Sequence, residues 1–268
     1  MDFDPALIAV PFRMQPGLSR LDEGAVQLTP LDPSGRLFEE KRRVAEAAQS
    51  RHAAPGFDPA PALAAIAREG RRLGHEPSAL PPELAWEEDF AVLDGAAGTI
   101  PWICACVPSH WAPEEKAGLP FAALHAPVAD AATLVAASAH LVKLATSGRW
   151  ERHVWTLSPS SRFDQHPHRH GRTAWPAAQD PEAFAAACWL RAERQTFFPV
   201  GEGSRQSVFT IRVMLEPLPV FAAEPGAARR LHDSLASMTD AVLAYKGLAE
   251  ARPRLLRWLS RQAGEEET

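Results

Sequence analysis

A histidine stands where a short apolar run meets a proline, in the stretch GLPFAALHAPV at residues 118–128. Pro127 restricts the residue before it to extended backbone, so a helix over the apolar run ends at about His125. A neutral imidazole at such an apolar corner can ligate a metal ion or a haem iron. The alternative, which this stretch alone favours, is a core histidine with one backbone hydrogen bond.

A second stretch that could carry chemistry is WLRAERQT at residues 189–196. If it forms a strand, Arg191, Glu193 and Gln195 point to one face of the sheet. Arg194 then points to the other face. The sheet buries at least one arginine whichever face is inward, and a buried guanidinium needs acceptors or an anion. Haem propionates, bound oxygen or a carboxylate could meet that need; the alternative is an arginine–glutamate pair between strands on a solvated face.

The composition excludes several classes of protein. The chain has 268 residues and a formal net charge of -5, which gives no sign of a nucleic-acid or polyphosphate binder. Its longest apolar runs are far short of the ~20 residues that a membrane span needs. Asp2 and Asp4 stand where a signal peptide would carry positive charge. We therefore expect a cytoplasmic protein that binds neither nucleic acid nor membrane.

The cysteine content limits the redox chemistry of the chain. Its three cysteines, Cys104, Cys106 and Cys188, do not make a disulfide framework. They are also too few for the cysteine ligands of an iron–sulfur cluster. The sequence contains neither GxGxxG nor GxxxxGKS/T, the loops that cradle nucleotide phosphates. We expect any nicotinamide or iron–sulfur electron source to lie on another protein.

The elements that position these stretches follow from hydrophobic patterns and capping residues. The proline-rich residues 1–33 are expected to form an extended arm. Ser34 and Asp58 are the expected N-caps of helices at residues 34–50 and 58–73. Further helices are expected at residues 111–117, 130–146, 225–248 and 252–262. Strands are expected at residues 89–93, 99–107, 152–157, 189–198 and 207–215.

The order of these elements predicts the fold class. Two strands, a helical excursion and a closing meander of strands make an α+β fold, with a five-stranded antiparallel sheet and helices on one face. This is the connectivity of a PAS-like domain, which holds small ligands between its sheet and the inserted helices. An unrelated α+β meander is the alternative. We expect an N-terminal arm and helices at residues 1–82, the PAS-like core at 83–220 and C-terminal helices at 221–268.

Several separated motifs carry a resemblance to a known family. In chain order they are PSHW at residues 108–111, KAG at 116–118, LHAPV at 124–128, LRAERQT at 190–196 and VFTIR at 208–212. On these motifs the chain resembles the haem-dependent oxidative N-demethylase family over roughly residues 28–220. The resemblance implies a PAS-type haem domain that acts as the oxygenase subunit of a dimethylamine demethylase.

The resemblance also implies roles for individual residues around a haem b. His125 would be the axial ligand of the iron, which leaves the opposite side open for oxygen. Arg194 and Gln195 would lie near that open side and polarise the bound oxygen. Glu193 would hold the substrate ammonium group or orient an arginine.

Three roles concern the binding of the cofactor itself. Arg191 or Arg212 would meet the haem propionates. Trp155 would stack over the porphyrin, with packing in the core as the alternative.

One segment departs from the acidic and polar loop expected of the family, FDQHPHRHGR at residues 163–172. Its histidines, His166, His168 and His170, alternate, so an extended chain would present them on one side. They could form a metal site, but a solvated loop near the mouth of the haem pocket is favoured.

The implied function is the oxidation of a methyl group of a small secondary amine, such as dimethylamine, with O2 and release of formaldehyde. Electrons would come from NADPH through a flavin and a 2Fe–2S cluster on a reductase partner. Two alternatives remain: a haem-binding PAS-type gas or redox sensor, and a haem-free descendant of the fold that binds a partner. A sensor would normally be fused to an output module, which this chain lacks, and Glu193 and Arg194 indicate a polar pocket that a sensor does not need.

Overall fold

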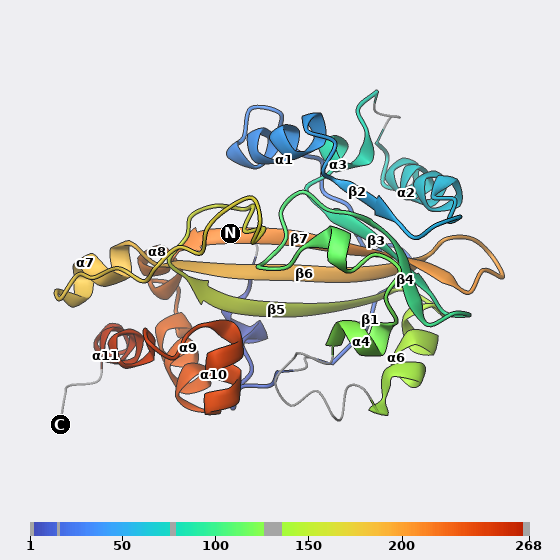
Figure 1. Cartoon of the computed structure of the whole chain (residues 1–268). Coiled ribbons are helices and arrows are strands. Elements are labelled where there is room, and N and C mark those ends of the chain that lie inside the picture. Colours follow the sequence, from blue (N-terminus) through green and yellow to red (C-terminus); the bar gives the residue numbers. More distant parts are fainter. Residues whose placement is uncertain (1–2, 15–16, 76–78, 126–135, 265–268) are drawn as a thin grey trace.

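An antiparallel sheet of seven strands organises the protein, whose computed structural model describes residues 3–14, 17–75, 79–125 and 136–264, the side chain of His125 excepted. The strands follow one another across the sheet in the order β1-β5-β6-β7-β3-β4-β2 (Figure 1). Their bounds are β1 (Ser19–Arg20), β2 (Arg51–Ala53), β3 (Asp89–Asp94), β4 (Thr99–Cys104), β5 (Trp150–Ser158), β6 (Trp189–Pro199) and β7 (Gln206–Pro217).

All the strands expected from the sequence are present, side by side in the order β5-β6-β7-β3-β4. β7 pairs with β3, so the last strand of the meander closes onto the first strand of the core. The expected number of five was wrong, because β1 and β2 extend the two edges of the sheet. These strands contain only 2 and 3 residues, which is too short to show an alternation of apolar and polar side chains. The α+β class is confirmed.

The helices lie in groups on opposite sides of this sheet. Their bounds are α1 (Arg36–Glu46), α2 (Ala60–Arg72), α3 (Pro82–Ala85), α4 (Phe121–His125), α6 (Ser138–Ala145), α7 (Pro181–Ala186), α8 (Leu218–Ala222), α9 (Ala227–Ala236), α10 (Asp240–Lys246) and α11 (Arg252–Gln262). Figure 1 shows α1, α2 and α3 gathered beside β2 and β3, and α9, α10 and α11 gathered beside β5. In the segments that the structure describes, none of these helices combines the length and the apolar character of a membrane span.

Both faces of the sheet are covered. We call the face that carries Arg191, Glu193 and Gln195 of β6 the polar face. Phe121 of α4 and Val142 of α6 pack in a cluster on this face. The opposite face packs against α2, α9 and α11. The helices between β4 and β5 lie on one face, as expected, and α1 packs on the same face against Ile211 and Val213 of β7. The expected placement of helices on one face does not hold for α2, α9 and α11.

Side-chain hydrogen bonds explain where helix limits differ from those expected. Gly35 rather than Ser34 caps α1, because Asp32 accepts hydrogen bonds from the amide (2.9 Å) and the hydroxyl (2.8 Å) of Ser34. The single helix expected at residues 225–248 is two helices, α9 and α10, because the side chain of Thr239 caps the start of α10. Residues 130–135 of another expected helix lie outside the described residues, and α6 is its described part.

A buried lysine fastens α1 to the start of β3. Lys41 Nζ donates to the carbonyl oxygens of residues 86–88 at 3.0, 3.0 and 2.8 Å. It also lies 3.2 Å from Asp89 Oδ1. Beside it, both carboxylate oxygens of Glu88 accept from the Thr29 amide, at 3.1 and 3.0 Å. This cluster places two carboxylates inside the protein with one lysine between them.

The raised pKa of the buried Glu88 carboxyl group makes the stability of the protein depend on pH. Burial raises the pKa of Glu88 from 4.5 to about 7, against the opposing effect of the hydrogen bond from Thr29. The folded protein therefore binds this proton more tightly than the unfolded chain does, so the contribution of Glu88 to stability is lost as the pH rises from about 4.5 to about 7. We expect Glu88→Gln to gain stability relative to the wild type by on the order of 3 kcal/mol across this window, measured by urea unfolding at a series of pH values.

The control for this measurement is Glu202→Gln, which changes an exposed glutamate between β6 and β7. Its stability should follow the wild type at every pH. A constant difference between Glu88→Gln and the wild type across the window would contradict the titration of Glu88.

Candidate active site

Strand β6 brings three of the predicted side chains to one face of the sheet. Arg191, Glu193 and Gln195 alternate along the strand and share the polar face. In the register with β5, Gln195 lies opposite Arg152 and Glu193 lies opposite Val154. The alternation expected from the sequence is confirmed, and β5 adds a second arginine to this face.

These side chains form a continuous run of hydrogen bonds, which we call the polar chain. Arg152 Nε donates to Gln195 Oε1 at 2.7 Å, and Gln195 Nε2 donates to Glu193 Oε2 at 2.6 Å. The other carboxylate oxygen of Glu193 accepts from the hydroxyl of Ser109. Arg191 Nε in turn donates to Ser109 Oγ at 2.7 Å. Glu193 is therefore held from both sides, by a serine and by an amide.

The position of Ser109 orients its hydroxyl proton. Because Ser109 Oγ accepts from Arg191, its own proton is directed to Glu193. Arg191 is only 1% exposed and is anchored by the carbonyl oxygens of Val107 (3.0 Å) and Arg162 (3.2 Å). Burial lowers the pKa of Arg191 to about 10, while the charge of Glu193 opposes that shift. Arg191 is thus a fixed support for Ser109.

The charges around Glu193 are predominantly positive. Burial lowers the pKa of Arg152, and it lowers the pKa of Lys246 to about 8, in both cases against the attraction of Glu193. Lys246 Nζ donates to the carbonyl oxygen of Trp155 at 2.8 Å. Within the described residues Arg152 makes a side-chain hydrogen bond only through Nε, which leaves its two Nη groups as donors. Three cations, Arg152, Arg191 and Lys246, therefore lie near the single carboxylate of Glu193. This excess of positive charge suits the binding of an additional anionic group.

His110 lies next to Ser109 in a backbone conformation that side chains seldom adopt, with φ at 60°. Desolvation, with the charges of Arg172 and Arg191, lowers the pKa of His110 to about 4. Its imidazole is therefore neutral near pH 7 and can act as a ligand or an acceptor.

The remaining arginines and the tryptophan predicted for the site lie on the opposite face. Arg194 Nε binds Glu151 Oε2 at 3.0 Å, and Arg212 Nε binds Glu87 Oε2 at 2.6 Å. Trp155 is 7% exposed and belongs to the hydrophobic core beneath the C-terminal helices. The structure therefore brings Arg191, Glu193 and Gln195 together and separates them from this second group by the thickness of the sheet.

The helix expected before the Ala-Pro step is present as α4, but the residues after His125 lie outside the described part of the chain, so its end before Pro127 stays a prediction. α4 spans Phe121–His125, and Phe121 packs in the same cluster as Phe197 of β6. The backbone of His125 therefore belongs to a helix that packs on the polar face. The side chain of His125 lies outside the described residues, so its role as a haem ligand stays a prediction.

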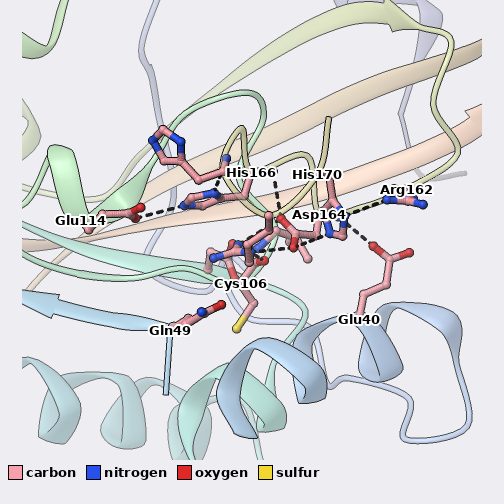
Figure 2. Close-up of polar contacts among 12 residues, drawn as sticks. Glu40, Gln49, Cys106, Glu114, Arg162, Asp164, His166 and His170 are labelled. Carbon is pink, nitrogen blue, oxygen red and sulfur yellow. Dashed lines mark hydrogen bonds and ion pairs between the residues drawn. The ribbon is translucent and has the colours of Figure 1, made fainter. Parts of the chain in front are cut away.

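The three histidines of the loop at residues 163–172 contact different partners. His166 Nε2 lies 3.0 Å from Glu114 Oε2, and His168 Nε2 lies 2.8 Å from Glu115 Oε1. His170 contacts an aspartate of its own loop instead (Figure 2). Among the described residues, no three histidine, cysteine or acidic side chains are arranged to hold a metal ion. Hydrogen bonds of the histidines, together with the ion pair of Arg169 with Asp164 at 2.8 Å, hold the loop in place.

Sequence reasoning missed Ser109 and Arg152 as members of the site. Ser109 belongs to the PSHW motif, but its contact with Glu193 joins residues 84 positions apart and has no local signal. Arg152 could be placed on the correct face only with the register between β5 and β6 in hand.

The fold and this site define an α+β protein with a buried, cation-rich polar chain on one face of its sheet. A model of the family described as haem-dependent oxidative N-demethylase, alpha subunit-like, matches residues 84–256. The match spans β3 to α11 and covers more than half of the chain, so the protein belongs to this family. Membership makes it a subunit of the haem-dependent oxidative N-demethylase type, and an alpha subunit implies a partner subunit.

Proposed function

We propose that this protein is the oxygenase subunit of an N-demethylase that acts on a small secondary amine such as dimethylamine. A methyl carbon is oxidised with O2, two electrons and two protons. The methyl group leaves as formaldehyde, the amine leaves with one methyl group fewer, and the second oxygen atom leaves as water. The observation that carries the proposal is the fixed carboxylate of Glu193 on a cation-rich face, in a chain of this family.

The charges of the polar face fit a haem b. The positive excess of Arg152 and Lys246 beside Glu193 suits the two propionates of the cofactor. Arg152 would meet a propionate through its Nη groups, whereas Arg191 is committed to Ser109 and to two carbonyl oxygens. His125 would ligate the haem iron. When bound, haem would supply the activation of oxygen.

Glu193 would bind the ammonium form of the amine by charge and by hydrogen bonding. Ser109 and Gln195 hold its two oxygens, so the carboxylate has one orientation in which to present the substrate methyl group. Gln195 would lie at the edge of the same pocket. In this proposal Arg194 stabilises the opposite face through its ion pair with Glu151.

Electrons would reach this subunit from NADPH through a flavin and a 2Fe–2S cluster on a reductase partner. The buried positions of Cys104, Cys106 and Cys188 support an electron source outside this chain. We place the protein in the cytoplasm. The pairing of β7 with β3, with the helical segment inserted before the meander, supports a PAS-like core.

The test is the absorption spectrum of the purified protein, oxidised and reduced, beside His125→Ala. We expect a Soret band that shifts on reduction and is lost or altered in His125→Ala, together with amine-dependent oxygen uptake when a surrogate reductant is added. His140→Ala, which removes an exposed histidine of α6, is the matched control and should keep the wild-type spectrum.

Each other outcome has a definite meaning. No Soret band after addition of haem would overturn the haem proposal. An unchanged band in His125→Ala would move the ligand elsewhere, with the neutral His110 as the next choice. A normal band without amine-dependent oxygen uptake would favour a sensor over an enzyme.

A further inference from the structure

A cleft of about 480 Å³ lies between α1 and the loop at residues 162–170. Its walls include Glu40, Arg43 and Gln49 on one side and Arg162, Asp164 and His170 on the other. Figure 2 shows Glu40 beside Asp164, His170 and Arg162. The volume is in the range of sites that bind small molecules.

The two acidic side chains of this cleft are already occupied. Asp164 accepts from Arg169 at 2.8 and 3.0 Å and from His170 Nε2 at 3.1 Å. Glu40 Oε2 accepts from the backbone amide of Asp164 at 2.8 Å. The carboxylates thus shape the loop, and the charge of Asp164 is balanced by Arg169.

The arginines at the rim retain donors. Arg162 Nη1 donates to His170 Nδ1 at 2.7 Å, which places the imidazole proton on Nε2, facing Asp164. The other Nη group of Arg162 and its Nε make no hydrogen bond to any residue that the structure describes. Arg43 likewise makes no hydrogen bond or ion pair with the described part of the chain, although its charge acts on Glu39. Two guanidinium groups with uncommitted donors therefore border one cleft.

We propose that this cleft binds a small dianion, a dicarboxylate or a phosphate group, between Arg43 and Arg162. Guanidinium groups match the planar oxygen pairs of carboxylate and phosphate and lose little hydration on binding them. A single cation would suit a monoanion, whereas two guanidiniums bordering a cleft of this size suit a double charge. The site is separate from the polar chain and does not rest on the proposed function.

The same loop connects the cleft to the polar chain. The carbonyl oxygen of Arg162 accepts from Arg191 Nη1 at 3.2 Å and from Gln165 Nε2 at 3.1 Å. Arg191 in turn supports Ser109 beneath Glu193. A dianion bound to Arg162 would therefore restrain the backbone carbonyl that anchors Arg191. Through Arg191 and Ser109, the bound dianion would then influence the polar chain around Glu193.

The experiment is calorimetric titration of the full chain with inorganic phosphate and, separately, with succinate, at constant ionic strength. We expect saturable binding of at least one dianion, weakened about tenfold or more in Arg43→Ala and in Arg162→Ala, since each removes a charged hydrogen-bond donor. Glu40→Gln keeps an acceptor for the Asp164 amide but removes a negative charge, so it should bind several-fold more tightly. Both arginines are exposed, so their replacement should leave the fold intact.

The matched control is Arg71→Ala, an exposed arginine on α2 away from the cleft, which should bind as the wild type does. Phosphate binding without succinate binding, or the reverse, identifies which oxyanion the cleft accepts. The proposal is overturned if neither dianion binds saturably, or if Arg43→Ala and Arg162→Ala bind with wild-type affinity.

Discussion

Glu193→Gln is expected to lower amine-dependent oxygen uptake about a hundredfold or more while the haem spectrum stays as in the wild type, because losing one partner of a buried charge pair costs ~2–5 kcal/mol. Glutamine has the size of glutamate and still accepts a hydrogen bond from Ser109. The loss therefore reports the missing charge together with one hydrogen bond, because the glutamine Nε2 cannot accept from Gln195 Nε2. Initial rates at saturating and at limiting amine separate weaker binding from slower turnover.

Two further variants make this result specific. Ser109→Ala leaves the charge of Glu193 but removes the hydroxyl that orients it, so we expect a smaller loss, about tenfold. Glu151→Gln breaks the ion pair with Arg194 on the opposite face and should leave the rate unchanged. Wild-type activity in Glu193→Gln, or an equal loss in Glu151→Gln, would contradict the assignment of Glu193 to the substrate.

The grouping of Arg191, Glu193 and Gln195 was predictable from the sequence because alternation along a strand is set by the backbone. The same rule places Arg194 on the other face, so a single pocket that contains both Arg194 and Gln195 conflicts with the strand that carries them. The family motif does not indicate which face of the sheet each of its residues occupies. Strand geometry is therefore the better guide to which residues of the motif share a site.

The partners of these residues were not predictable in the same way. Arg152 reaches Gln195 only because β5 and β6 pair in one register, and a shift of one residue would turn it to the opposite face. Ser109 reaches Glu193 from a loop after β4. These two contacts depend on the tertiary environment rather than on propensity. The start of α1 depended instead on local competition, because Asp32 accepts a hydrogen bond from the Ser34 hydroxyl, which then does not cap the helix.

The attachment of α1 to β3 explains why a lysine can be fully buried in this protein. Lys41 is 0% exposed, donates to three consecutive carbonyl oxygens and lies 3.2 Å from Asp89 Oδ1. Asp89 Oδ2 accepts from the Val107 amide at 2.8 Å. Asp89 Oδ1 accepts no hydrogen bond from any described residue, so its compensation is the charge of Lys41. The lysine therefore joins α1, β3 and the segment that leads to Ser109.

Lys41→Met should lower the free energy of unfolding by roughly 3–5 kcal/mol, because it removes the cation that compensates the buried charge of Asp89 and the donor to three carbonyl oxygens. Methionine fills much of the same volume, so a cavity is not the cause. Adding Asp89→Asn removes that charge, and the double variant should recover part of the loss, as measured by urea unfolding. Lys143→Met on the exposed side of α6 is the control, with a change within about 0.5 kcal/mol. A Lys41→Met protein as stable as this control would show that Asp89 is compensated without the lysine, and α1 would then be held to the sheet by its apolar contacts alone.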